Sequence, residues 1–178
     1  MITDNQLLQP VTSYEKIPVT IFSNADEACK AVAAEIAQLI RSKQKEGTNA
    51  VLGLATGSTP KKIYRQLIRM HREEGLSFRN VICFNLDEYY PLPAESKQSY
   101  RHFMQENLFN HVDINPGNCH IPDGQAGLES IKQLCEQYEK LIQDAGGVDF
   151  QLLGIGRNGH IGFNEPGSNI SSLTRLIT

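Results

Sequence analysis

The residue types best suited to chemistry gather in the glycine-rich stretch 154–166, where His160 lies close to Asn158 and Glu165. An imidazole titrates near neutrality and can both accept and donate a proton, while an amide or carboxylate partner fixes its orientation and tautomer. This pattern predicts proton transfer by His160, with Asn158 and Glu165 as its partners. The other histidines lack such neighbours and are expected to be structural: His71, His102, His111 and His120.

A second candidate is Asp87, which follows the apolar segment 81–86 and precedes Glu88. A carboxylate beside apolar walls is partly desolvated, so its pKa rises and it becomes suited to act as a general base. For a single aspartate, a solvated loop acid or a helix cap is the more common explanation. The same explanation applies to Glu88, to which we assign no role.

The third candidate is the turn formed by Thr56, Gly57, Ser58 and Thr59. Hydroxyl groups and unpaired backbone N–H groups at a helix N-terminus favour an anion such as a phosphate. Taken alone, such a turn serves equally well to bend and cap the chain, and it is not the GxxxxGK[ST] nucleotide loop. These four residues are therefore candidate phosphate ligands that need support from the rest of the sequence.

The three turns follow three apolar segments that are predicted to be buried strands: residues 50–55, 81–86 and 148–155. Strands are also expected at 19–22 and entering at 173–178. Four helices are expected: one that begins after Ser23 or Asn24, one that Thr59 caps and that runs from Pro60 to Glu74, and two that cover 99–109 and 128–144. Alternating strands and helices indicate a parallel α/β sheet, in which ligands bind beyond the carboxyl ends of the strands. The three turns should therefore converge on one pocket.

Three strings of the sequence together closely resemble the glucosamine-6-phosphate deaminases: Leu54-Ala-Thr-Gly-Ser-Thr-Pro60, Phe84-Asn-Leu-Asp-Glu-Tyr89 and Gly154-Ile-Gly-Arg-Asn-Gly-His-Ile-Gly-Phe-Asn-Glu-Pro166. The resemblance implies a Rossmann-like three-layer α/β sandwich with a mostly parallel sheet. It also implies a reaction that converts glucosamine 6-phosphate and water to fructose 6-phosphate and ammonia, with neither a metal nor an organic cofactor.

The same resemblance implies a role for each candidate residue. Residues 56–59 match the phosphate loop, Asp87 matches the base that moves a proton from C2 towards C1, and His160 matches the group that assists opening of the pyranose ring. Asn158 and Glu165 match positions that hold and tune this histidine. Because a neutral amide cannot raise the pKa of an imidazole as a carboxylate would, we predict Glu165 as the main electrostatic partner of His160.

The family pattern also bears on regulation and on length. In allosterically activated members a second sugar phosphate binds just after the Asn-Glu-Pro motif; Ser168 and Arg175 match such positions, but Ile177 replaces a lysine, so activation by N-acetylglucosamine 6-phosphate is not expected. Family members continue beyond residue 178 and supply an Arg and a Lys to the phosphate from later segments. We therefore expect an N-terminal extension at 1–16, a partial domain at 17–178 whose sheet is incomplete at its C-terminal end, and weak or no turnover.

The composition is that of a soluble globular chain: 178 residues, 40% apolar and 21% charged, with a formal net charge of −3. The sequence shows no basic surface, signal peptide or membrane-spanning run, so we expect no nucleic acid or membrane as partner. The four scattered cysteines lack the spacing of a metal site or a disulfide framework. These features fit a cytoplasmic enzyme with a small amino-sugar phosphate as its partner, and a homo-oligomer is a family expectation.

Two other functions stay open. 6-Phosphogluconolactonase is a related hydrolase with the same kind of sheet and phosphate turn, but its counterpart of the string at 164–166 is expected to lack Asn-Glu-Pro. A non-catalytic sugar-phosphate sensor would keep the phosphate turn without needing Asp87, His160 and Glu165 together. Residues 1–16 are too few and too polar for a DNA-binding helix-turn-helix.

Overall fold

A computed structural model describes residues 17–177, so the expected N-terminal extension at 1–16 lies outside the described residues. The described chain forms one parallel sheet of four strands in the order β3-β2-β1-β4. The two central strands, β1 (Ala50–Leu54) and β2 (Val81–Asn85), pair along their whole length. Every residue of β1 is buried, as predicted for a strand covered on both faces.

The two edge strands are short. β3 (Cys119–His120) pairs with β2 opposite Cys83 and Phe84, and β4 (Phe150–Gln151) pairs with β1 opposite Leu52 and Gly53. No apolar run marks β3 in the sequence, which is why it was not predicted.

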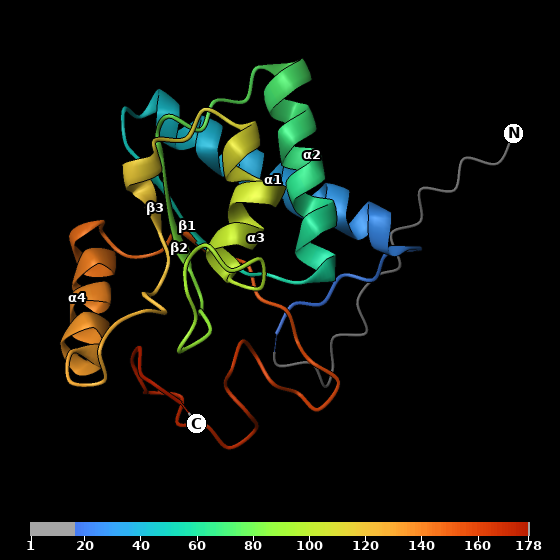
Figure 1. Cartoon of the computed structure of the whole chain (residues 1–178). Helices are drawn as coiled ribbons and strands as arrows, with labels where there is room; N and C mark the ends of the chain where they lie inside the picture. The colour runs from blue at the N-terminus through green and yellow to red at the C-terminus, as the bar shows by residue number, and fades with distance from the viewer. Residues whose placement is uncertain (1–16, 178) are drawn as a thin grey trace, which may run out of the picture.

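Helices cover both faces of the sheet and give the expected three-layer sandwich (Figure 1). α1 (Ala25–Lys45), α2 (Ser58–Glu74) and α3 (Tyr100–Asn107) lie on one face, and α4 (Ile131–Asp144) lies on the other. Two 3₁₀ turns lead from α3 to β3: η1 (Phe109–His111) and η2 (Pro116–Asn118).

The core is divided by the sheet into a large and a small part. Successive side chains of a strand point to opposite faces. Leu52 and Leu54 pack in the large cluster with Ile36 of α1 and Leu67 of α2. Val51 packs on the other face in a small cluster with Phe84 of β2 and Tyr138 of α4. Most of the buried apolar surface therefore lies on the α1–α3 side.

The chain reverses its direction across the sheet beside β1. It first passes from β1 through α2 to β2, and through α3 to β3, always on one face; α4 then crosses the other face and leads to β4 on the far side of β1. In open α/β sheets this reversal opens a crevice at the carboxyl ends of the strands, where ligands bind.

The helix starts agree with the sequence in two cases and differ in two. Asn24 caps α1 by accepting hydrogen bonds from the N–H groups of Asp26 and Glu27 at 3.0 and 2.9 Å, and Ser99 caps α3. The predicted Thr59 cap of α2 is wrong, because the helix already begins at Ser58 after Gly57, whose φ of +115° favours glycine and turns the chain earlier. α4 begins at Ile131, three residues later than expected.

Three predicted strands are wrong in whole or in part. Residues 19–22 and 173–177 form no strand, and the expected strand at 148–155 is reduced to Phe150 and Gln151. Beyond that pair the apolar side chains of Leu153 and Ile155 are 48% and 78% exposed. The physical reason is that a strand requires a hydrogen-bonded neighbour. Within the described residues, segments 19–22 and 173–177 have no such neighbour, and segment 148–155 has β1 on one side only.

Candidate active site

The candidate residues lie in the loops at the carboxyl end of the sheet. Residues 56–59 follow β1, Asp87 follows β2, and residues 152–165 follow β4. β1 and β4 are the neighbours between which the chain reverses, so the first and third loops flank the expected crevice.

Three aromatic rings join these loops. The centroid of the Tyr89 ring lies 4.9 Å from that of Tyr100 and 5.1 Å from that of Phe163, and the last two rings stack at 5.9 Å. Burial and a hydrogen bond with Tyr89 raise the pKa of Tyr100, while a hydrogen bond with Thr56 lowers this pKa. The loops after β2 and β4 thus meet through Tyr89 and Phe163, while the convergence of all three turns on one pocket stays a prediction.

The loop after β4 also comes into direct contact with Asp87. Gly162 has a φ of +58°, and a Cβ atom at this position would lie 3.0 Å from the Asp87 Oδ2 atom and 2.8 Å from the Leu86 Cδ2 atom. A side chain here would require the Leu86 and Asp87 side chains to move, and the positive φ also favours glycine. Gly162 is thus the residue that lets the two loops approach each other.

The Asp87 carboxylate is half-buried, and its pKa is raised to about 6. Burial is the main cause, because it disfavours the charged form, and the negative charge of Glu88 adds to it. A carboxylate with this pKa is largely ionised at neutral pH but holds a proton well enough to pass it on. These are the properties of a general base.

Glu88 stabilises the start of α3. Its Oε1 atom accepts hydrogen bonds from the N–H groups of Tyr89 (2.9 Å) and Tyr100 (2.8 Å), and its Oε2 atom accepts one from the N–H of Arg101 (3.0 Å). A carboxylate here also interacts favourably with the positive end of the helix dipole. The explanation of Glu88 as a helix cap is therefore confirmed, and Glu88 keeps Tyr100 in the aromatic cluster.

Asn158 links His160 to Glu165. The Asn158 Oδ1 atom lies 2.6 Å from the His160 Nδ1 atom, and the Asn158 Nδ2 atom donates to the Glu165 Oε2 atom at 2.6 Å. Since an amide oxygen only accepts, the ring proton lies on Nδ1, and Nε2 is left free to exchange a proton. The expected direct pairing of Glu165 with His160 is not what the structure has: the carboxylate holds the amide, and the amide holds the ring.

The His160 ring packs closely against a glycine. A Cβ atom on Gly156 would lie between 2.2 and 2.5 Å from three ring atoms, so any side chain there would displace the ring. The Gly156 N–H donates to the His160 carbonyl oxygen at 2.8 Å, and the Gly159 N–H donates to the Gly156 carbonyl oxygen at 3.0 Å. These two bonds close a tight turn that keeps the ring over the Gly156 backbone.

The loop at 56–59 leaves the start of α2 open. Within the described residues no side chain caps this helix, and its first turn contains no acidic residue. Gly57, Ser58 and Thr59 are exposed. The first N–H groups of a helix lack partners inside the helix, and together with the helix dipole they favour an anion.

Asn85 is a further polar residue that the sequence analysis had not selected. It ends β2 two residues before Asp87, is 1% exposed, and has no hydrogen-bond partner among residues 17–177 for either polar atom of its side-chain amide. Its neighbours on the same face of the strand are the apolar core residues Cys83 and Val81. In the sequence, the signal that could have identified Asn85 is its position in the string at 84–89 that resembles the family.

The two candidate allosteric residues make separate contacts. Arg175 donates to the side-chain oxygens of Ser172 at 2.7 Å and Asn164 at 2.8 Å, while the N–H of Ser168 donates to the carbonyl oxygen of Glu165 at 3.0 Å. Arg175 is therefore bound to the residue next to Glu165, and the assignment of an effector site to Ser168 and Arg175 stays a prediction.

Other features of the described chain bear on the site. Its four cysteines are free thiols, and no three His, Cys, Asp or Glu side chains of residues 17–177 are grouped as metal ligands. None of the helices in this part of the chain is long and apolar enough to cross a membrane. Two cavities lie away from Asp87 and His160, one between α4 and residues 173–176 and one between α2 and α3.

Comparison with known proteins gives a family match over most of the chain. Residues 23–163 match the family described as glucosamine-6-phosphate isomerases/6-phosphogluconolactonase. A putative glucosamine-6-phosphate deaminase-like protein of Bacteroides thetaiotaomicron is 51% identical over 94% of this chain and 25% of its own length. Glucosamine-6-phosphate deaminases of Mycoplasma mycoides and Thermoanaerobacter sp. are 51% and 47% identical over 82% and 92% of this chain, which covers 58% and 61% of theirs.

Solved structures give the same result. A monomeric glucosamine-6-phosphate deaminase superimposes with a TM-score of 0.85 at 44% identity, covering 91% of this chain and 65% of its own. The 6-phosphogluconolactonase of Thermotoga maritima superimposes less well, with a TM-score of 0.62 at 27% identity over 76% of this chain and 59% of its own. The chain thus spans less than two thirds of these relatives, and it belongs to the family of glucosamine-6-phosphate isomerases and 6-phosphogluconolactonases.

Proposed function

We propose that this chain carries the deaminase chemistry of its family, the conversion of glucosamine 6-phosphate and water to fructose 6-phosphate and ammonia. The observation that carries the proposal is the meeting, at one edge of the sheet, of the loop that holds Asp87 and the loop that holds His160 in one tautomer. The relatives named glucosamine-6-phosphate deaminase, at 47–51% identity, support the choice of substrate.

The phosphate of the substrate would bind at the open start of α2. Residues 56–59 offer N–H groups and hydroxyls there, and no acidic side chain of the first helical turn repels the anion. Anchoring the phosphate converts remote binding energy into alignment of the reacting carbons.

His160 would open the pyranose ring. Its Nδ1–H donates to Asn158, so Nε2 can take the proton of the anomeric hydroxyl and return one to the ring oxygen. Asn158 and Glu165 act as positioning residues that fix this tautomer.

Asp87 would then carry out the isomerisation. In the open-chain sugar it removes the proton from C2 and delivers it to C1, while a proton passes from the amino group to the C1 oxygen, which leaves a C2 imine and a C1 hydroxyl. Water hydrolyses this imine to the ketone and releases ammonia. A pKa of about 6 suits both halves of the transfer, since the carboxylate is ionised at the start and its acid form is strong enough to return the proton.

The proposal also covers the cellular location and the oligomeric state of the protein. Free thiols at all four cysteines fit a reducing compartment, so we propose the cytoplasm. The expectation of a homo-oligomer is balanced by the structural neighbour, which is described as monomeric. Light scattering during size-exclusion chromatography measures this directly.

The test is ammonia release from glucosamine 6-phosphate, measured for these 178 residues and for a version extended to the length of the relatives. Asp87→Asn should lower turnover by at least about 10²-fold, whereas Asp144→Asn is the matched control, because Asp144 is an exposed carboxylate at the end of α4 paired with Lys140. Lactone hydrolysis without ammonia release would replace the proposal with the lactonase function. Substrate binding without turnover in the longer version would replace it with the sensor function.

A further inference from the structure

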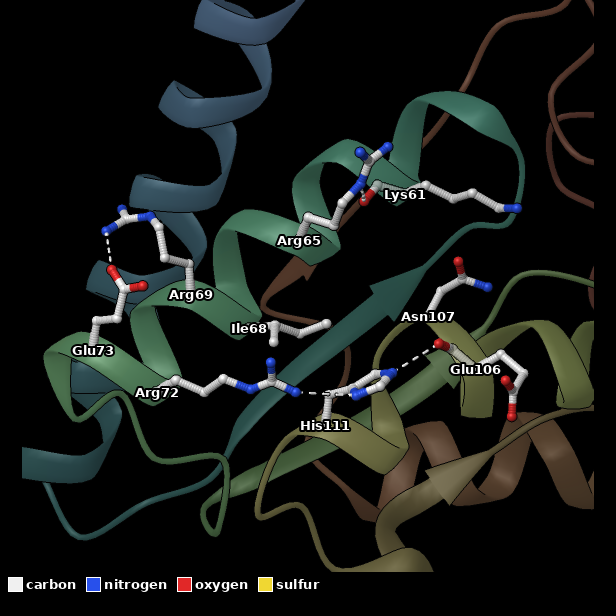
Figure 2. Close-up of a pocket in the computed structure, with 9 residues that line it drawn as sticks. All are labelled: Lys61, Arg65, Ile68, Arg69, Arg72, Glu73, Glu106, Asn107 and His111. Atoms are coloured by element: carbon white, nitrogen blue, oxygen red, sulfur yellow. Dashed lines mark hydrogen bonds and ion pairs between the residues drawn. The ribbon is translucent and has the colours of Figure 1, made fainter.

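A groove with a volume of about 480 Å³ runs between α2 and the segment formed by α3 and η1. Figure 2 shows a row of basic side chains along α2 on one side of it, with Asn107 and His111 on the other. None of the residues assigned above to the candidate active site lines this groove. What it binds is therefore a separate question from the proposed deaminase chemistry.

The charges along the groove are unbalanced. Arg69 pairs with Glu73 at 3.4 Å and Glu74 at 2.9 Å. Within the described residues, the other basic side chains of the row form no ion pair with a carboxylate: Lys61, Arg65 and Arg72. Of the two acidic lining residues, Glu73 pairs with Arg69, and Glu106 forms no ion pair in the part of the chain that the structure describes. The groove is thus positive on a chain whose formal net charge is −3.

The unpaired cations are held in place by contacts that leave their charge intact. The Arg65 Nε–H donates to the Lys61 carbonyl oxygen at 3.3 Å, and the Lys61 Nζ atom lies 5.1 Å from the centre of the Phe103 ring. At the other end, the Arg72 Nη2 atom lies 3.3 Å from the His111 Nδ1 atom. Both guanidinium groups therefore keep N–H groups free for a ligand.

His111 is present as the tautomer that can accept a hydrogen bond from Arg72. Its Nε2 atom lies 2.9 Å from the carbonyl oxygen of Glu106, which can only accept, so the proton lies on Nε2 and Nδ1 accepts from Arg72. This bond draws the Arg72 guanidinium across the groove, as Figure 2 shows. Keeping like charges close together along one side of a helix costs free energy, which a bound anion would offset.

We propose that this groove binds a small phosphorylated ligand that carries negative charge at two or more positions. Guanidinium groups match phosphate oxygens with paired hydrogen bonds. At a rise of 1.5 Å per residue, Lys61 and Arg65 are separated along α2 by about 6 Å and Arg65 and Arg72 by about 10 Å, more than one phosphate spans. The volume lies in the range of small-molecule sites, and Ile68 supplies an apolar wall.

The experiment is a calorimetric titration of the chain with inorganic triphosphate at low salt. We expect saturable binding that the double variant Arg65→Gln/Arg72→Gln weakens by roughly tenfold or more, because it removes the charge-assisted hydrogen bonds. The matched control Lys132→Gln/Lys140→Gln removes the same charge from α4 and should leave the affinity unchanged. Ser58→Ala, in the proposed phosphate loop at 56–59, should leave the affinity of the groove unchanged and should affect only binding at the start of α2.

A second readout does not depend on how the variants fold. In the wild-type chain, triphosphate should shift the side-chain amide resonances of Asn107 in NMR spectra. The proposal is overturned if triphosphate does not bind, if the α4 control loses as much affinity as the groove variant, or if only Ser58→Ala loses affinity. Orthophosphate binding as tightly as triphosphate would also overturn it, since the ligand would then need only one charged position.

Discussion

The loops that follow β1 and β2 are held quite differently from the loop that follows β4. The first two leave five-residue strands that pair with each other and are almost wholly buried. The third leaves a two-residue strand at the edge of the sheet, and its apolar residues Leu153 and Ile155 are largely exposed. The proposed phosphate loop and base thus follow the most deeply buried strands of the sheet, while the proposed acid–base histidine does not.

The difference shows how the exposed loop still keeps a defined geometry. Its histidine is ordered by local means, namely the bonds of Asn158 and the close contact with Gly156. Its position relative to Asp87 depends on Gly162 and on the stacking of Phe163 against Tyr100. Burial orders the first region, and hydrogen bonds and glycine contacts order the second.

The largest expected effect is on the chemistry that depends on the buried region. Asp87→Asn keeps the shape of the side chain but removes the base, so kcat of the family-length protein should fall by roughly 10²- to 10⁴-fold with little change in KM. Steady-state ammonia release measures this. A loss of less than tenfold would mean that another group abstracts the proton.

The second prediction tests the difference in stability between the regions. Leu52→Ala in β1 should lower the free energy of unfolding by about 2–5 kcal/mol, because Leu52 is fully buried in the large core. The matched variant Leu153→Ala, on the half-exposed side chain beyond β4, should change it by less than about 0.5 kcal/mol. Urea unfolding of the 178-residue chain gives both values, and equal losses would contradict the comparison.

The third prediction concerns the hydrogen-bonded series at His160. Asn158→Ala should lower kcat by roughly tenfold, because it removes the direct partner of the ring, and Glu165→Gln should lower it less, since Glu165 acts through the amide. The ¹⁵N NMR spectrum of the imidazole should show mixed tautomers in Asn158→Ala only. A larger effect of Glu165→Gln would restore Glu165 as the main partner.

The fourth prediction is a pH dependence of stability. The pKa of Asp87 is about 6 in the folded chain, above its usual value, so its contribution to stability is fully present at low pH and is lost as the pH rises through about 6. The stability gained by Asp87→Asn relative to wild type should therefore be greater at pH 8 than at pH 4, by about 1–2 kcal/mol after allowance for partial exposure. Urea unfolding at the two pH values measures it, and a constant difference would contradict the raised pKa.

The smallest expected effect is that of Glu88→Gln. Removing the charge at the start of α3 should lower the free energy of unfolding by about 0.5–1 kcal/mol. Since the Glu88 charge also raises the pKa of Asp87, the acidic limb of the kcat/KM profile should move to lower pH. A shift to higher pH would mean that Glu88 acts on Asp87 in another way.

The sequence by itself determined the central strands, the helices between them and the residue types at their ends. Continuous apolar runs at 50–55 and 81–86 mark strands with neighbours on both faces, and residues such as Asn24 and Ser99 mark helix starts, because these signals are local. The position of the three turns at one edge of the sheet also followed from local patterns, since parallel strands place their carboxyl ends at one edge.

Only the tertiary structure decided where each of these patterns was overridden. The apolar run at 148–155 resembles the other two, yet pairing ends after Gln151, since strand length depends on a neighbour that no local pattern reveals. The partner of His160 was likewise a matter of geometry: charge favoured Glu165, but the turn places Asn158 against the ring. The role of Tyr100 and the basic groove beside α2 depend on contacts between segments far apart in the chain. No local sequence pattern reveals such contacts, because they form only when the chain folds.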